Sequence, residues 1–111
     1  MTFENILLES IDEGLSCLGE HAKEAVYQHL KNKYALNKQD IPYIIEDFTD
    51  AIEDIFQAAA KLLEIKIMKI LFTKMEDVNV PIDNPENWEF TNYIYALRNS
   101  GLLPRLSFAP C

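Results

Sequence analysis

Apolar residues recur at helical spacing along the first third of the chain. From the N-terminus they follow one another every three or four positions, with acidic residues between them: Phe3, Ile6, Leu7, Ile11, Leu15 and Leu18. This spacing places them on one face of an α-helix. Gly19 is expected to end that helix, because glycine accepts the left-handed conformation of a helix C-cap. The stretch "EHAKEAVYQHLKNKYAL" repeats the pattern and predicts a second helix.

A longer helical pattern from Pro42 to Met75 predicts the central helix of the fold. The stretch "NKQDIP" before it has the composition of a connection, with Asp40 as a helix cap and Pro42 in the first helical turn. Up to Ala59 one side of this helix is apolar and the opposite side is acidic, with Glu46, Asp47, Asp50, Glu53 and Asp54. The acidic side indicates a solvated face or a surface for a basic partner.

Residues 60–75, "AKLLEIKIMKILFTKM", depart from this one-sided pattern. One apolar stripe continues the core face, and a second stripe appears on the side that had been acidic: Ile65, Met68, Phe72 and Met75. Either the helix breaks near Ala58–Lys61 and restarts in a new orientation, or it runs straight and is covered from two sides. A chain this short covers one stripe more easily than two, so the second stripe predicts a homodimer interface.

The character of the chain changes after Met75. Residues 76–84 predict a loop, and residues 85–111 predict a C-terminal helix followed by a tail. Pro85 suits the first helical position, and Gly101 is placed to end the helix. The apolar tail is expected to pack on the body or on a neighbouring subunit through Leu102, Leu103, Leu106 and Phe108. The whole chain is therefore predicted to be one all-α domain, a bundle of four or five helices with a helical body over 1–75.

Composition excludes several classes of protein. The length of 111 residues suits a single domain, and the net charge of −8 repels the phosphate backbone of nucleic acids. The apolar stretch at 60–75 is too short and too charged to cross a bilayer. The N-terminus lacks a signal-peptide pattern, so we expect a cytoplasmic protein. From the net charge and the charged apolar stretch we expect neither nucleic-acid nor membrane partners. Cys17 and Cys111 are expected to be reduced thiols, since they do not form a dense disulfide framework.

No short motif with a recognisable catalytic mechanism occurs in the sequence, so we expect a non-enzymatic protein without a cofactor. The arrangement closest to a metal site is Glu13, Cys17, His21 and Glu24, which would share one helix face if the first two helices were continuous. Gly19 lies inside this set, and no metal site is assigned. His29 falls on the apolar side of its helix and is expected to be partly buried. Cys17, His21 and His29 are the candidate polar contributions to a ligand pocket.

Three stretches carry a resemblance to a known family: "ESIDEGLSCLGEHAKEAVYQHL", "DIPYIIEDFTDAIEDIF" and "KLLEIKIMKIL". Over about residues 6 to 75 the chain resembles small, uncharacterised archaeal helical domains, found alone or as presumed output modules at the ends of signalling proteins. The resemblance implies an archaeal source and an interaction role, and it transfers no catalytic residue. Such domains tend to have a glycine shortly after the position of Phe56, where this chain has Gln57. That difference favours a longer and straighter central helix.

Taken together, these patterns predict a protein-interaction or regulatory module that acts as a helical homodimer. Its partner is expected to be a second copy of the chain or another protein, because a helix with two apolar stripes and an acidic face suits protein partners. The alternative function is a small-ligand- or metal-binding helical protein with a pocket between its helices.

Overall fold

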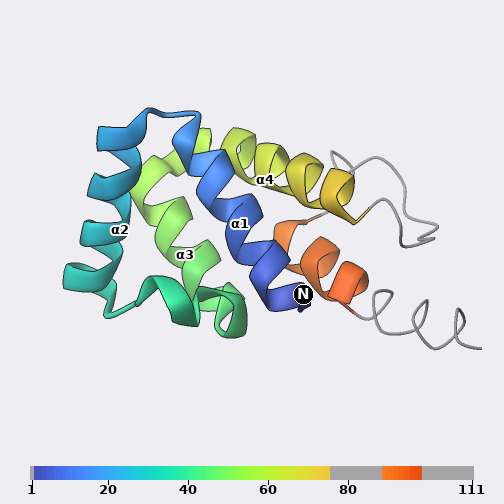
Figure 1. Ribbon diagram of the computed structural model, residues 1–111. Coiled ribbons are helices and arrows are strands. Elements are labelled where there is room, and N and C mark those ends of the chain that lie inside the picture. The colour runs from blue at the N-terminus through green and yellow to red at the C-terminus, as the bar shows by residue number, and fades with distance from the viewer. Residues whose placement is uncertain (1, 76–88, 99–111) are drawn as a thin grey trace, which may run out of the picture.

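The computed structural model describes residues 2–75 and 89–98 (Figure 1). It contains helices α1 (Phe3–Ser16), α2 (Glu20–Tyr34), α3 (Ile45–Phe56) and α4 (Ala60–Lys74), and the short 3-10 helices η1 (Lys38–Tyr43) and η2 (Gln57–Ala59). Residues 90–98 are also helical, and no strand occurs in the described ranges. The predicted all-α fold is confirmed. None of the described helices combines the length and the apolar character that crossing a membrane requires.

Helices α1 and α2 are separate because the chain turns at Gly19. The Thr2 hydroxyl caps α1 by accepting a hydrogen bond from the Asn5 N–H at 3.1 Å. The helix ends at Ser16, and Gly19 is not its C-cap but the residue before α2, with φ of 105°. Glycine adopts a positive φ without the steric cost that a Cβ imposes on other residues. The four residues of the candidate metal arrangement therefore do not share one helix.

The connection before α3 is more structured than the sequence predicts. Pro42 lies inside η1, and α3 begins at Ile45 without a side-chain cap. The prediction that Asp40 caps the long helix and that Pro42 starts it is therefore wrong. The backbone tightens into 3-10 turns instead, and both Ile41 and Pro42 are buried. Burial of these two side chains fixes η1 against the body and delays the start of α3.

The long segment predicted from Pro42 to Met75 is helical from Ile45 to Lys74, but it bends. Gln57 has φ of 54° and ψ of −127°, outside the α-helical region, and η2 joins α3 to α4. Figure 1 shows α3 and α4 running in different directions. The straight central helix inferred from the lack of a glycine is therefore wrong. The alternative prediction, that the helix breaks near Ala58–Lys61 and restarts in a new orientation, describes the structure. Gln57 itself adopts the glycine-like conformation, and its Nε2 donates to the Asp54 carbonyl at 2.7 Å.

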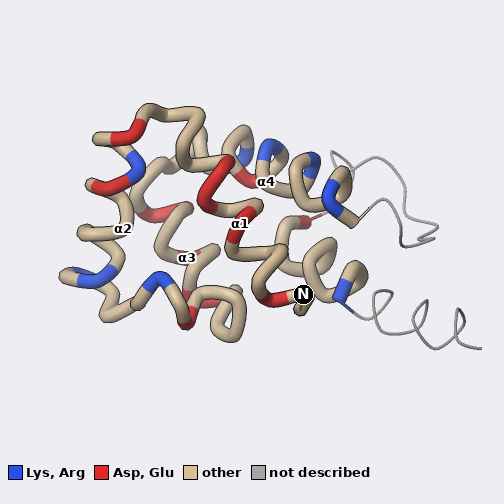
Figure 2. The backbone as a smooth tube through the Cα atoms, in the orientation of Figure 1, with Lys and Arg blue, Asp and Glu red and all other residues tan. Residues whose placement is uncertain are grey.

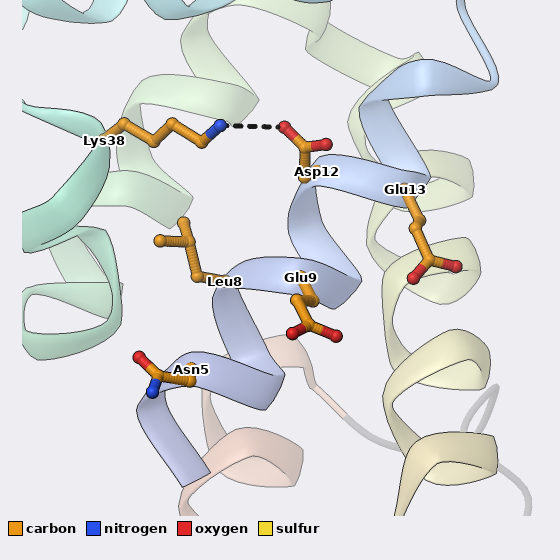
Figure 3. Close-up of a pocket in the computed structure, with 6 residues that line it drawn as sticks. All are labelled: Asn5, Leu8, Glu9, Asp12, Glu13 and Lys38. Carbon is orange, nitrogen blue, oxygen red and sulfur yellow. Dashed lines mark ion pairs between the residues drawn. The ribbon is translucent and has the colours of Figure 1, made fainter. Parts of the chain in front are cut away.

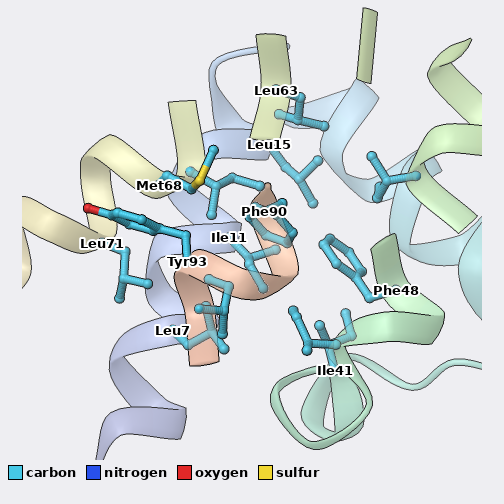
Figure 4. Close-up of a cluster of buried hydrophobic side chains, with 14 of the residues drawn as sticks. Leu7, Ile11, Leu15, Ile41, Phe48, Leu63, Met68, Leu71, Phe90 and Tyr93 are labelled. Carbon is cyan, nitrogen blue, oxygen red and sulfur yellow. The ribbon is translucent and has the colours of Figure 1, made fainter. Parts of the chain in front are cut away.

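The core lies between α1, α3, α4 and the helical residues 90–98 (Figure 4). The predicted apolar face of α1 is buried as far as Leu15, and Leu7, Ile11 and Leu15 are fully buried. Leu18, which was predicted to continue this face, lies beyond the end of the helix and is 44% exposed. Helices α1 and α4 approach closely at Gly14, where an added Cβ would lie 2.6 Å from Ile67 Cγ1. A glycine is needed at this point, because a larger residue would push α4 away.

The predicted C-terminal helix is confirmed over the residues that the structure describes. It buries an apolar face against the body through Phe90, Tyr93, Ile94 and Leu97. The Phe90 ring lies 6.5 Å from that of Phe48 on α3. The predicted loop at 76–84, Trp88, Gly101 and the apolar tail lie outside the described residues.

The bend at Gln57 generates a stability prediction. Replacing Gln57 by glycine should raise the free energy of unfolding by up to about 1 kcal/mol, because the strain of a positive φ exceeds the extra chain entropy that glycine loses. Urea denaturation followed by circular dichroism measures the change. Gln57→Ala is the matched control, since it removes the same side chain but keeps a Cβ, and it should give no gain. Equal stability of the glycine and alanine variants would contradict the prediction.

Candidate functional site

Helix α4 has an inner face that the chain buries and an outer face that it leaves accessible. The inner face consists of Leu63, Ile67, Met68, Leu71 and Met75, all buried. We define the outer face of α4 as Leu62, Ile65, Lys66, Lys69 and Phe72, which lie on one side at helical spacing. On this face the side chain of Leu62 is 73% exposed and that of Phe72 is 38% exposed. Two large apolar residues exposed on one face of a helix make this face a candidate contact surface.

The structure divides the second apolar stripe that the sequence assigned to a dimer interface. Met68 is 0% exposed and Met75 is 5% exposed, so both belong to the core of their own chain and cannot serve a second subunit. Figure 4 shows Met68 within the buried cluster. Of the four predicted residues, Ile65 is partly buried and Phe72 is exposed. The prediction is therefore corrected for Met68 and Met75, because the bend at Gln57 turns that side of α4 towards the body.

Sequence reasoning missed Leu62, the most exposed apolar residue of α4. Leu62 belongs to neither apolar stripe of residues 60–75, and its neighbours Lys66 and Lys69 on the outer face are basic. Figure 2 shows basic positions recurring along α4. The predicted acidic side of α3 is exposed at each of its five positions, as expected for a solvated face. In the sequence, the available sign of this exposed face was Leu62, a single leucine that shares a helix side with Lys66 and Lys69.

A cleft of about 600 Å³ lies at the elbow where α3 meets α4. Its lining includes Thr49 and Glu53 of α3, Lys61 and Glu64 of α4, and Glu89 and Phe90 beside the last described helix. The elbow brings these side chains together from segments that are far apart in the sequence. A straight helix would have separated Glu53 and Glu64 along its axis by about 16 Å at the usual rise per residue.

Glu64 is unusual among the residues of this cleft because its charged side chain is buried, whereas the apolar Leu62 on the same helix is exposed. Its side chain is 4% exposed, and its Oε2 has no hydrogen-bond partner among the described residues. Burial raises the pKa of Glu64 to about 7, and the neighbouring Glu53 carboxylate adds to this rise, while the charge of Lys61 opposes it. Near neutral pH this carboxyl group therefore changes between its protonated and charged forms.

A second group of charged residues lies on the outer side of α1, around Asp12 (Figure 3). The Asp12 carboxylate accepts a hydrogen bond from Tyr27 at 3.0 Å and pairs with Lys38 at 3.1 Å and Lys23 at 3.3 Å. Burial would raise the pKa of Asp12, but the hydrogen bonds from these three side chains together lower it. Because its oxygens are occupied, Asp12 ties α1 to α2 and η1 and does not offer a ligand site.

The candidate ligand residues named from the sequence do not form a site. Cys17 is an exposed free thiol that contacts the Glu13 carbonyl at 3.5 Å, and His21 is exposed on α2. His29 is also exposed, so its predicted partial burial is wrong. Its ring makes an edge-to-face contact with the Tyr34 ring, with 5.8 Å between the ring centroids. Across residues 2–75 and 89–98, no three His, Cys, Asp or Glu side chains are close enough to hold a metal ion.

The chain was also compared with known proteins. No protein-family model, curated protein or solved structure matches it. The archaeal source and the signalling role that the resemblance implies therefore stay predictions. Two features of the described residues stand out, the exposed outer face of α4 and the carboxyl pair in the elbow cleft.

The buried carboxyl group generates a prediction about pH. Since the pKa of Glu64 is higher in the folded chain than in the unfolded one, its contribution to stability is present at low pH and is lost as pH rises through about 7. Glu64→Gln, which cannot ionise, should be more stable than the wild type by roughly 3 kcal/mol at about pH 8, and the difference should shrink below about pH 5. Urea denaturation across this range measures it.

The matched control is Glu24→Gln, which makes the same chemical change at an exposed position on α2. This variant should follow the wild-type pH profile. A Glu64→Gln protein whose stability difference from the wild type is constant with pH would contradict the raised pKa.

Proposed function

We propose that this chain is a non-enzymatic protein-interaction module whose contact surface is the outer face of α4. The observation that carries the proposal is the exposure of Leu62 and Phe72 on a helix whose opposite face is fully used by the core. Helices that present apolar anchors at such spacing commonly dock on a partner surface. The exposed leucine and phenylalanine are the anchors, and the lysines between them set the polarity of the partner.

The partner in this proposal is a second copy of the chain. Lys66 and Lys69 make the outer face of α4 basic, whereas the chain as a whole carries a net charge of −8. A second copy therefore offers acidic surface, including the exposed Asp47 and Asp50 of α3. Long lysine stems cover apolar surface while their charged ends reach towards such acids. This complementarity of charge favours self-association over contact with a basic partner.

The outer face of α4 alone is too small for a stable dimer interface, so neighbouring surface must also be buried. The ten-residue step from Leu62 to Phe72 spans about 15 Å along the helix, which is short for an interface that must bury at least about 1,000 Å² in total. In a two-fold dimer both copies contribute the same surface, so each contact between an exposed neighbouring position and the partner is made twice. The exposed acids Asp47 and Asp50 of α3, which do not line the elbow cleft, are candidates for this addition.

Light scattering after size-exclusion chromatography tests the proposal. The wild type should have the mass of a dimer, and a Leu62→Glu, Phe72→Glu double variant should have the mass of a monomer with unchanged helical circular dichroism. Each glutamate places a charge where the partner would bury an apolar side chain, so the dissociation constant should rise by at least about a hundredfold. Met68 is unsuitable for this test, since it is buried in its own chain.

Tyr43→Glu serves as the control, because Tyr43 is 71% exposed on η1 and does not belong to the outer face of α4. This variant should remain dimeric. A wild type that is monomeric at high micromolar concentration would reject self-association. A double variant that keeps the dimer mass would show that the contact lies elsewhere.

A further inference from the structure

We propose that the cleft at the α3–α4 elbow binds a small organic cation, whose ammonium group sits on the Glu53 and Glu64 carboxyl pair. This role is separate from the outer face of α4. It assigns a ligand site to residues that the core and the proposed dimer contact leave unexplained.

The first support is the buried acceptor. Glu64 is 4% exposed, lines the cleft, and leaves its Oε2 without a hydrogen-bond partner among the described residues. Burying such an oxygen unsatisfied costs free energy, and native proteins rarely keep one without a role. A donor that enters the cleft would satisfy this oxygen after the Glu64 side chain turns towards it, because the oxygen is closed to solvent in the structure. An ammonium group brings three donors, which suits two facing carboxyl groups.

The second support is the charge of the cleft. Glu53 from α3, Glu64 from α4 and Glu89 before the last described helix line it, and the basic residue among its described lining is Lys61. The cleft therefore carries excess negative charge whenever Glu64 is ionised. The charge of Lys61 acts on Glu64 but does not cancel the combined effect of burial and Glu53. A cation is the ligand charge that relieves this imbalance.

The shape and lining of the cleft favour an organic cation over a metal ion. Its volume of about 600 Å³ exceeds that of a bare ion many times, and its walls include the apolar Ala58, Ala60 and Phe90. Such walls suit the hydrocarbon part of an alkylamine. Hard metal ions prefer six or more oxygen ligands, whereas no group of three metal-binding side chains gathers within residues 2–75 and 89–98.

Binding must be linked to the release of a proton. Because the pKa of Glu64 is about 7, the carboxyl group carries a proton in part of the molecules near neutral pH. The incoming ammonium group pairs with the carboxylate form, so the Glu64 proton passes to the solvent as the ion pair forms. Glu53, Glu89 and Lys61 are the other ionisable groups among the described residues that line the cleft. Affinity should therefore rise with pH.

Isothermal titration calorimetry with putrescine, a short alkyl diamine, tests the site at constant ionic strength. The dissociation constant should be about tenfold lower at about pH 8 than at about pH 6, as expected for a carboxyl group with a pKa of about 7. At about pH 6, repeating the titration in buffers of different ionisation enthalpy should reveal nearly one proton released for each diamine bound. Butanediol, which matches the chain length without the charge, should not bind.

Two variants complete the experiment. Glu64→Gln keeps the shape of the side chain without its charge, and it should weaken putrescine binding by at least about tenfold and abolish the proton release. Glu24→Gln, on the exposed side of α2, should bind as the wild type does. Helical circular dichroism of both variants confirms that they are folded.

Three results would overturn the proposal. The first is the absence of saturable heat with putrescine at either pH, and the second is equal affinity of wild type and Glu64→Gln. The third is saturable binding of magnesium or calcium chloride without binding of the diamine, which would make the cleft a metal site. None of these results depends on the oligomeric state, so the site and the proposed dimer contact succeed or fail separately.

Discussion

The close approach of α1 and α4 at Gly14 is the constraint on which the rest of the structure depends. An added Cβ at this glycine would lie 2.6 Å from Ile67 Cγ1, so the two helices meet with almost no space between them. Buried side chains on both helices, such as Leu15 on α1 and Leu71 on α4, form the core on either side of this point. Dense packing of this kind fixes which side of α4 faces inward.

The bend at Gln57 follows from the same constraint. To place α4 against α1, the chain must leave the direction of α3, and it does so through a residue with φ of 54° and a short 3-10 turn. The turn brings Glu53 and Glu64 to one cleft and leaves Leu62 on the outside. A buried glutamate and an exposed leucine on one helix both oppose local preference, and such conflicts are most common where a protein binds something.

Much of the fold could be predicted from the sequence, because helical periodicity is a local property. The spacing from Phe3 to Leu15 identifies α1 and its buried face, and the acidic positions of α3 identify its solvated face. The course of the chain at Gln57 could not be predicted, since glutamine rarely adopts a positive φ and nothing local requires it. That conformation accompanies the packing of α4 against α1, a contact between segments far apart in the sequence that periodicity does not encode.

The candidate sites were predicted only in part for the same reason. All four predicted residues share one stripe of α4, but the edge with Met68 and Met75 is buried in the core, and only Ile65 and Phe72 belong to the accessible side. The Glu53 and Glu64 pair was missed because the two residues are far apart along any continuous helix and meet only at the elbow. The contact between side chains that a bend brings together cannot be predicted from the spacing of residues along the sequence.

The central claim is that this bend gives α4 a face committed to its own core and a face committed to a partner. Thiol labelling tests it most directly, with Phe72→Cys and Met68→Cys each placed in a chain that also carries Cys17→Ser and Cys111→Ser. The account predicts that the thiol at position 72 reacts quickly in dilute protein and more slowly as the protein concentration rises, while the thiol at position 68 is protected throughout. Equal reactivity at the two positions, or a rate at position 72 that is independent of concentration, would contradict it.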